Sequence, residues 1–188
     1  MSPADAFDIL RSALVQAGIR YAVGGSWAST AFGEPRFTND VDILAEITPK
    51  NLALFLRLLP DTFYADADEA MSALHRGRPF NIIHMPSVLK FDLFPSHAFP
   101  LGKQELDRAI SLEDTGLSKK PTRFVTPEDI LLAKLYWFKS GGEVSEVQWR
   151  DIIGIARGCS ATLDRDYLQR SASDLGVGNL LHKALTEA

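Results

Sequence analysis

The sequence lacks the features that would place it in a membrane or in an oxidising compartment. It contains a single cysteine, Cys159, which excludes an intrachain disulfide and favours a reducing environment. No window approaches the roughly 18 apolar residues that a membrane span requires. The initial segment MSPADAFDIL has no basic stretch followed by an apolar one. We therefore expect a cytoplasmic protein with no membrane partner.

The sequence also lacks an excess of positive charge. Its formal net charge of -4 gives no basis for nonspecific wrapping of nucleic acid, although a local basic patch could still steer an RNA or a nucleotide. The dense basic cluster is Lys119, Lys120 and Arg123, and the sequence does not decide whether it binds RNA. The four histidines show no metal-ligand spacing, so none is assigned to a metal.

What is present fits a globular protein with two parts. Hydrophobic residues make up 46% and charged residues 23% of the 188 residues, which is enough for a main domain with a helical appendage. Helix starts are marked where an N-cap residue precedes proline, at Ser2-Pro3, Thr48-Pro49 and Thr126-Pro127. After residue 125 only helical apolar spacing is found, so the boundary is placed there.

The periodicity of apolar residues predicts the order of helices and strands. Helices are expected over residues 5–16, 26–32, 50–59 and 66–75, and strands over 19–23, 39–45, 80–85 and 89–94, with two short strands near Ile110 and Phe124. The predicted fold class is therefore α+β, with a mixed sheet flanked by helices in residues 1–125 and a C-terminal helical bundle in residues 126–188.

Three aspartates lie in apolar strands, where aspartate is disfavoured. Because side chains alternate along a strand, Asp40 and Asp42 share one face, with Cα atoms about 6.6 Å apart. Asp92 is the only acidic residue of the strand pair at 80–94. Shared carboxylates of this kind hold divalent ions in phosphoryl and nucleotidyl transfer, and Asp92 could also act as a base. The alternative is a solvated strand face or a turn cap.

The turn Gly24-Gly25-Ser26 connects a predicted strand to a predicted helix. Such a turn offers unpaired N–H groups and the positive end of a helix dipole to a phosphate, with no Cβ in the way. Taken alone, it is more typical of an ordinary connection between a strand and a helix than of a phosphate site.

Two other groups of residues are assigned structural roles. Trp27, Trp137 and Trp149 fit helix core positions better than a base-stacking platform, although Trp27 is next to the Gly-Gly-Ser turn. Glu128 and Asp129 are most simply first-turn acids favoured by the helix dipole.

The order and spacing of these residues resemble the polymerase-beta-like nucleotidyltransferase superfamily, and most of all its AbiEii-type and minimal nucleotidyltransferase branch. The residues that carry the resemblance are Gly24, Gly25, Ser26, Gly33, Arg36, Thr38, Asp40, Asp42 and Asp92. Residues 126–130 with Lys134, and residues 150–152, are similar to the helical half of those proteins. The resemblance runs from about Tyr21 to the C-terminus.

The resemblance implies roles for these residues. Asp40, Asp42 and Asp92 would hold two Mg²⁺ or Mn²⁺ ions, while the Gly-Gly backbone and Ser26 would contact the phosphates of a nucleoside triphosphate such as ATP. Three further residues would order the loop or reach phosphate, namely Arg36, Thr38 and Lys134. If these residues have no such role, Arg36 is a surface arginine, Thr38 is a threonine at the start of a strand, and Lys134 is a lysine that extends to solvent.

The implied activity is transfer of a nucleoside monophosphate from the triphosphate to an acceptor hydroxyl, with release of pyrophosphate. The acceptor is RNA, protein or a small molecule, and the sequence does not choose among them. Similar proteins include toxins of toxin–antitoxin pairs, so an antitoxin protein is one expected partner. The alternatives are a catalytically silent nucleotide- or RNA-binding module of the same fold and a metal-dependent phosphotransferase or nuclease.

Overall fold

The computed structural model describes residues 2–32 and 38–188, and these form two compact units. The first unit consists of Met1–Gly24 and Thr38–Val125, and the second of Gly25–Phe37 and Thr126–Ala188. The predicted α+β class with a mixed sheet is confirmed. The assignment of residues 1–125 and 126–188 to separate domains stays a prediction.

The sheet lies within the first unit, and its strand order in the described residues is β3-β4-β5-β2-β1-β7-β6. The β2–β5 and β1–β7 pairs are parallel and the other pairs antiparallel, which makes the sheet mixed. The strands are β1 (Tyr21–Val23), β2 (Asp40–Ala45), β3 (Phe63–Tyr64), β4 (Phe80–His84), β5 (Leu89–Pro95), β6 (Ile110–Leu112) and β7 (Thr122–Phe124).

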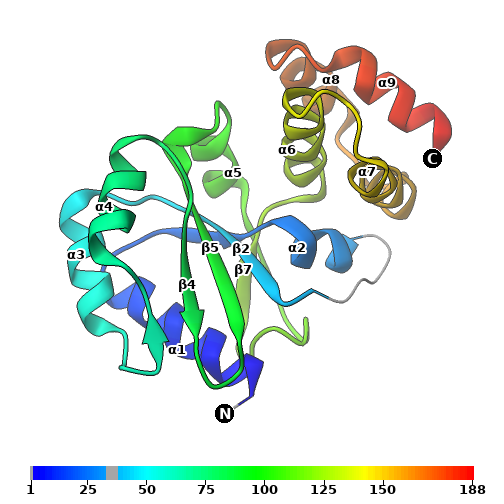
Figure 1. Cartoon of the computed structure of the whole chain (residues 1–188). Coiled ribbons are helices and arrows are strands. Elements are labelled where there is room, and N and C mark those ends of the chain that lie inside the picture. Colours follow the sequence, from blue (N-terminus) through cyan, green and yellow to red (C-terminus); the bar gives the residue numbers. More distant parts are fainter. Residues whose placement is uncertain (1, 33–37) are drawn as a thin grey trace. The chain divides into compact units, whose positions relative to one another are not determined.

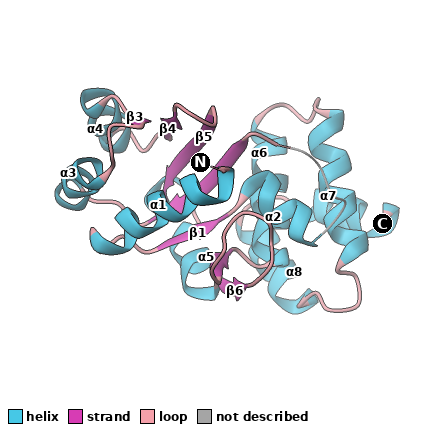
Figure 2. Ribbon diagram, turned by 90° about the horizontal axis from the view of Figure 1, so that it is seen from below, coloured by secondary structure: helices cyan, strands magenta, loops and turns pink. Residues whose placement is uncertain are grey.

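One face of the central strands forms the core of the first unit. Residues alternate along β5 between buried and partly exposed positions, with Phe91 and Leu93 fully buried. The ring of Phe7 lies 6.4 Å from that of Phe91, so α1 (Pro3–Gln16) covers this face. Figure 1 shows α1 grouped with α3 (Pro49–Leu58) and α4 (Ala67–His75), and Figure 2 shows α3 and α4 beside each other at the β3 and β4 end.

The helix starts that the sequence marks are confirmed. In each of three helices the N-cap hydroxyl accepts the backbone N–H three residues later. These N-caps are Ser2, Thr48 and Thr126. The sequence did not indicate α5 (Gly102–Arg108), the short strand β3 or the 3₁₀ turn Ser96–Ala98. Helix α5 has no side-chain N-cap and begins at a glycine, since a Cβ there would lie 2.1 Å from the carbonyl oxygen of Ser96.

The second unit is helical. Helix α2 (Gly25–Phe32) packs against two of the C-terminal helices, α6 and α7. The C-terminal helices are α6 (Pro127–Ser140), α7 (Glu146–Gly158), α8 (Arg165–Asp174) and α9 (Gly178–Glu187). Among the described residues, no helix has the length and apolar character needed to cross a membrane.

Buried acids connect α6 to α8. Glu128 and Asp129 lie in the first turn of α6, as the sequence predicts, and they also bind groups outside that turn. The carboxylate of Asp129 is fully buried, accepting a hydrogen bond from Thr126 Oγ1 at 2.8 Å and another from the Tyr167 hydroxyl. Glu128 Oε1 accepts the backbone N–H of Asp164 at 3.0 Å. Trp137, expected in the core, is instead 45% exposed.

Candidate functional site

The three aspartates of the predicted site lie on adjacent strands of the sheet. β2 and β5 run parallel in a register that pairs Asp40 with Lys90 and Asp42 with Asp92. Residues that are paired across neighbouring strands point to the same face of a sheet. All four side chains therefore share the face opposite to the buried core, where Asp40 is exposed and the other three are partly exposed.

The polar face continues onto the next strand. Asn81 of β4 is paired with Asp92, and Ile83 is paired with Lys90. The result is a row of polar residues across three strands, formed by Asp42, Asp92 and Asn81. Asn81 was not among the predicted site residues. Once the register is known, the alternation of side chains in residues 80–85 shows to which face of the sheet Asn81 points.

Lys90 forms ion pairs with two of the aspartates on this face. Its Nζ atom lies 2.9 Å from Asp92 Oδ2 and 3.5 Å from Asp40 Oδ1. The hydrogen bond to Asp92, and the charge of both carboxylates, raise the pKa of Lys90 above its usual range. Sequence reasoning missed this residue, although it lies two positions before Asp92 and so has the same facing.

The oxygen atoms of the three carboxylates are suitable ligands for a divalent cation, but Lys90 forms ion pairs with two of the three carboxylates. Hard cations prefer oxygen ligands, and three carboxylates on one half-open face provide them. As the side chains lie, no group of three His, Cys, Asp or Glu residues in the described ranges is gathered closely enough to hold a metal. The ammonium of Lys90 takes the place of a shared cation between Asp40 and Asp92. The three carboxylates therefore offer the oxygen ligands that a divalent cation prefers, although their side chains, as they lie, are not gathered around one point.

The Gly-Gly-Ser turn begins beside Asp42. The N–H of Gly24 donates to the carbonyl oxygen of Asp42 at 2.9 Å, so the expectation of an unpaired N–H at Gly24 is wrong. Gly25 has a positive φ of 52° and begins α2, which places Ser26 in the first turn of that helix. Among the residues that the structure describes, a Cβ at Gly24 would meet only Val125, at 4.0 Å, and the φ of Gly24 is not positive. Packing and backbone conformation therefore give no reason for a glycine at this position.

The remaining predicted phosphate-contacting residues divide into three cases. Arg36 lies outside the described residues. Thr38 Oγ1 accepts the N–H of Asp40 at 3.2 Å and so helps to begin β2. In the second unit, Lys134 of α6 pairs with Asp151 of α7, Nζ to Oδ2 at 2.9 Å. The proposed contacts of these residues with phosphate stay predictions.

The basic cluster is partly occupied by contacts within the first unit. Lys119 Nζ lies 2.6 Å from Asp5 Oδ1. Arg123 donates to the carbonyl oxygens of Leu106 and Ala109, at 3.0 Å each, next to the end of α5. These two cations therefore have structural partners, which weakens the case for an RNA-binding patch.

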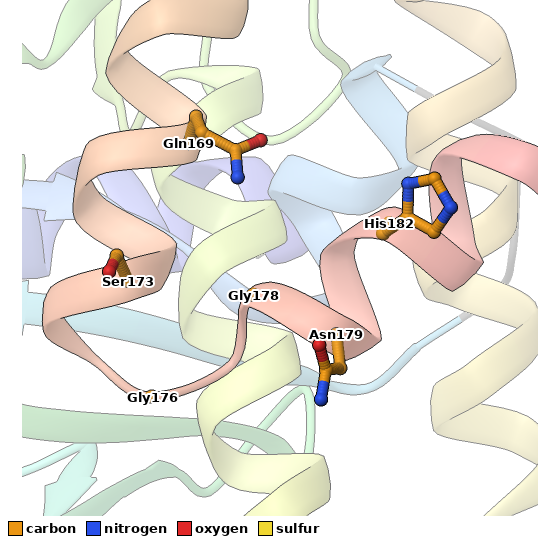
Figure 3. A pocket seen from close by; sticks show the side chains of 6 residues that line it. All are labelled: Gln169, Ser173, Gly176, Gly178, Asn179 and His182. Carbon is orange, nitrogen blue, oxygen red and sulfur yellow. The ribbon is translucent and has the colours of Figure 1, made fainter.

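A pocket of about 420 Å³ lies in the second unit, between α8 and α9 (Figure 3). Its lining offers hydroxyl, amide and imidazole groups but no carboxylate, and it includes none of the predicted site residues. The lining residues are Gln169, Ser173, Gly176, Gly178, Asn179 and His182.

Comparison with solved structures assigns the fold. An antigenic nucleotidyltransferase-like protein from Paracoccidioides brasiliensis superposes with a TM-score of 0.56 and 17% identity, over 99% of this chain and 94% of that chain. The chain has a nucleotidyltransferase fold. The antibiotic-resistance factor ANT(2'')-Ia gives a TM-score of 0.52 and 17% identity, over 98% of this chain and 94% of that chain.

The likeness is one of structure. No protein-family model and no curated protein sequence matches the chain. The solved structures support the fold, whereas membership of the polymerase-beta-like superfamily and of its AbiEii-type branch stays a prediction. At this identity the comparisons establish the fold, and the activity has to be argued from the site.

Proposed function

We propose that the protein is a divalent-metal-dependent nucleotidyltransferase, which moves a nucleoside monophosphate from a triphosphate to an acceptor hydroxyl. The observation that carries this proposal is the register of β2 and β5, which sets Asp42 beside Asp92 and Asp40 on the same face of a nucleotidyltransferase fold. Aspartate is disfavoured in strands, so three on one face require a reason beyond folding. Binding of a cation is that reason.

The carboxylates hold the reacting groups together. Asp40, Asp42 and Asp92 would hold Mg²⁺ or Mn²⁺, and the bound ion would supply positive charge for the triphosphate and for the acceptor oxygen. Asp92 takes the proton of that hydroxyl as its oxygen bonds to the α-phosphorus. The bond from the α-phosphorus to the bridging oxygen breaks, and pyrophosphate leaves with that oxygen. The protein contributes mainly positioning and electrostatic stabilisation.

The Gly-Gly-Ser turn is the proposed phosphate contact. Among the described residues nothing crowds a Cβ at Gly24, so there is room for a phosphate to approach its backbone closely. Gly25 and Ser26 lie in the first turn of α2, at the positive end of the helix dipole. We include Arg36, Thr38 and Lys134 as further residues that order or contact the triphosphate.

The acceptor is a hydroxyl of RNA, protein or a small molecule. A role as the toxin of a toxin–antitoxin pair fits the resemblance in sequence, and a separately encoded antitoxin is then the expected partner. A small-molecule acceptor is the alternative, since one structural neighbour is an antibiotic-resistance factor. The proposal places the protein in the cytoplasm, where nucleoside triphosphates are present.

A second candidate function is a nucleotide- or RNA-binding module without catalysis. The ion pairs of Lys90 with Asp40 and Asp92 favour it, because they satisfy two of the carboxylates without a metal. Metal stoichiometry in the presence of a non-hydrolysable triphosphate separates the two. Two ions per chain indicate catalysis, and one or none indicates a module.

The direct test is transfer of label from each nucleoside triphosphate labelled at the α-phosphate. Purified protein is incubated with Mg²⁺ and then Mn²⁺, against total RNA, protein extract and a small-molecule extract. Asp42→Asn removes one charge of the proposed site, and we expect label transfer to fall on the order of 100-fold or more. Asp61→Asn is the matched control, because Asp61 is exposed and lies between α3 and β3.

The acceptor class is identified by the extract that becomes labelled. Full activity of Asp42→Asn would show that the mechanism is wrong. Absence of label with every triphosphate and every acceptor would favour the binding module. Labelled product without release of pyrophosphate would indicate a different phosphotransfer reaction, since only nucleotidyl transfer yields both.

A further inference from the structure

Among the described residues paired across β2, β5 and β4 on the polar face, Lys90 is the one whose charge has the same sign as that of a metal ion. Its two ion-pair partners, Asp40 and Asp92, both belong to the proposed ligand set. The side chain of Lys90 is 37% exposed and that of Asp92 21%, so neither group is fully solvated. At 2.9 Å the ammonium of Lys90 and the carboxylate of Asp92 form a hydrogen bond as well as an ion pair.

The balance of charge on this face depends on Lys90. Three aspartates contribute three negative charges and Lys90 one positive charge, so the four side chains together carry two negative charges. One divalent ion matches that remainder. Two ions, which nucleotidyl transfer by two metals uses, would leave an excess of positive charge unless Lys90 moved away or the phosphates of the nucleotide arrived.

We propose that Lys90 is an internal cation that competes with the divalent metal for Asp40 and Asp92 in the nucleotide-free protein. This inference rests on the proposed function, because it assumes that the three carboxylates are the metal ligands. Metal binding is then weak without nucleotide, since the ion pairs of Lys90 must first break. The triphosphate supplies additional ligands for the metal and a new anionic partner for the ammonium of Lys90.

The inference predicts coupling between nucleotide and metal. Binding of the triphosphate frees the carboxylates from Lys90, so nucleotide and metal increase each other's affinity. Without Lys90 this part of the coupling disappears. If Lys90 had only a structural role, it would not produce this coupling between nucleotide and metal, because loss of an ordinary ion pair does not strengthen binding of metal.

The experiment measures Mn²⁺ affinity without nucleotide, from the electron paramagnetic resonance signal of free Mn²⁺. We expect Lys90→Met to lower the Kd for Mn²⁺ about tenfold, which corresponds to about 1.4 kcal/mol. Lys90→Arg keeps the charge and should bind as weakly as the wild type. Lys119→Met is the matched control, because Lys119 also forms an ion pair in the first unit, but with Asp5.

Three further measurements complete the design. Melting curves of the metal-free proteins verify folding, and Lys90→Gln, which keeps a hydrogen-bond donor, replaces Lys90→Met if that variant does not fold. Repetition with a non-hydrolysable triphosphate should strengthen Mn²⁺ binding more in the wild type than in Lys90→Met. Asp42→Asn measures whether Mn²⁺ binds at these carboxylates at all.

The outcomes separate the inference from the proposed function. Tighter binding by Lys90→Met alone, with Lys119→Met like the wild type, supports the inference. An unchanged or weaker affinity in Lys90→Met, while Asp42→Asn loses binding, overturns the inference and leaves the proposed metal site intact. Wild-type affinity in Asp42→Asn would mean that the carboxylates are not the ligands, and both proposals would fall.

Discussion

Replacing Tyr167 by phenylalanine removes one hydroxyl group from the interior of the second unit. That hydroxyl donates to Oδ1 of Asp129, whose side chain is fully buried. The ring is kept, so the loss is that of a hydrogen bond to a desolvated carboxylate rather than of packing. Hydrogen bonds to charged groups contribute about 1.5–3 kcal/mol, and we expect Tyr167→Phe to lower the free energy of unfolding by about 2 kcal/mol.

The assay is urea denaturation followed by tryptophan fluorescence. Trp27, Trp137 and Trp149 all lie in helices of the second unit, so the signal reports on that unit. With a urea dependence of about 2 kcal/mol per molar, the midpoint should fall by about 1 M. Tyr64→Phe is the control, because Tyr64 is 57% exposed and the same atom is removed.

The control should change stability by less than about 0.5 kcal/mol. An equally small change in Tyr167→Phe would refute the reasoning, since it would show that Asp129 does not depend on this donor. A large change in both variants would indicate that loss of a tyrosine hydroxyl is costly wherever it occurs.

Three other predictions follow from the described contacts. If Lys134 contacts the triphosphate, Lys134→Met should raise the KM for the nucleotide about tenfold, and Asp151→Asn should not. Equal effects of the two variants would mean that the ion pair between these residues stabilises the helical unit and that Lys134 does not contact the nucleotide. Burial lowers the pKa of His84 below its ordinary value of 6.5. The unfolded chain therefore binds a proton more readily, stability falls as the pH drops from 7 towards 5, and His84→Gln should flatten that slope in circular dichroism melts at each pH. Gly18→Ala should lower the free energy of unfolding by about 1 kcal/mol, because the φ of Gly18 is 68°. Gly178→Ala, which has open space at its Cβ, should leave the free energy of unfolding unchanged in the same melts.

Most of the fold could be predicted because its signals are local. Alternating apolar residues define β2, β4 and β5, and hydroxyl N-caps before proline define the starts of α1, α3 and α6. The short elements were missed because two residues of β3 carry no period, and α5 begins at a glycine without a side-chain cap. A Cβ at Gly102 would clash with the backbone of Ser96, a close approach that the spacing of apolar residues does not reveal.

The candidate site could be predicted as a set of carboxylates but not as an arrangement of charges. The facing of Asp40 and Asp42 follows from alternation along one strand. Their pairing with Lys90 and Asp92 depends on the register between β2 and β5, which about forty intervening residues separate in the sequence. The burial of Asp129 is likewise a consequence of α8 packing on α6, and a helix-dipole argument cannot reveal it.

The two-segment construction of the second unit has a consequence for synthesis of the chain. Helix α2 is translated early, but α6 and α7, on which it packs, begin only at Pro127 and Glu146. At about 5–20 residues per second, the ribosome needs roughly 5–20 s to reach α6. During that interval the first unit can complete its strands while the apolar side of α2 has no partner. A nascent chain that stops near residue 125 would therefore be a substrate for chaperones rather than a finished domain.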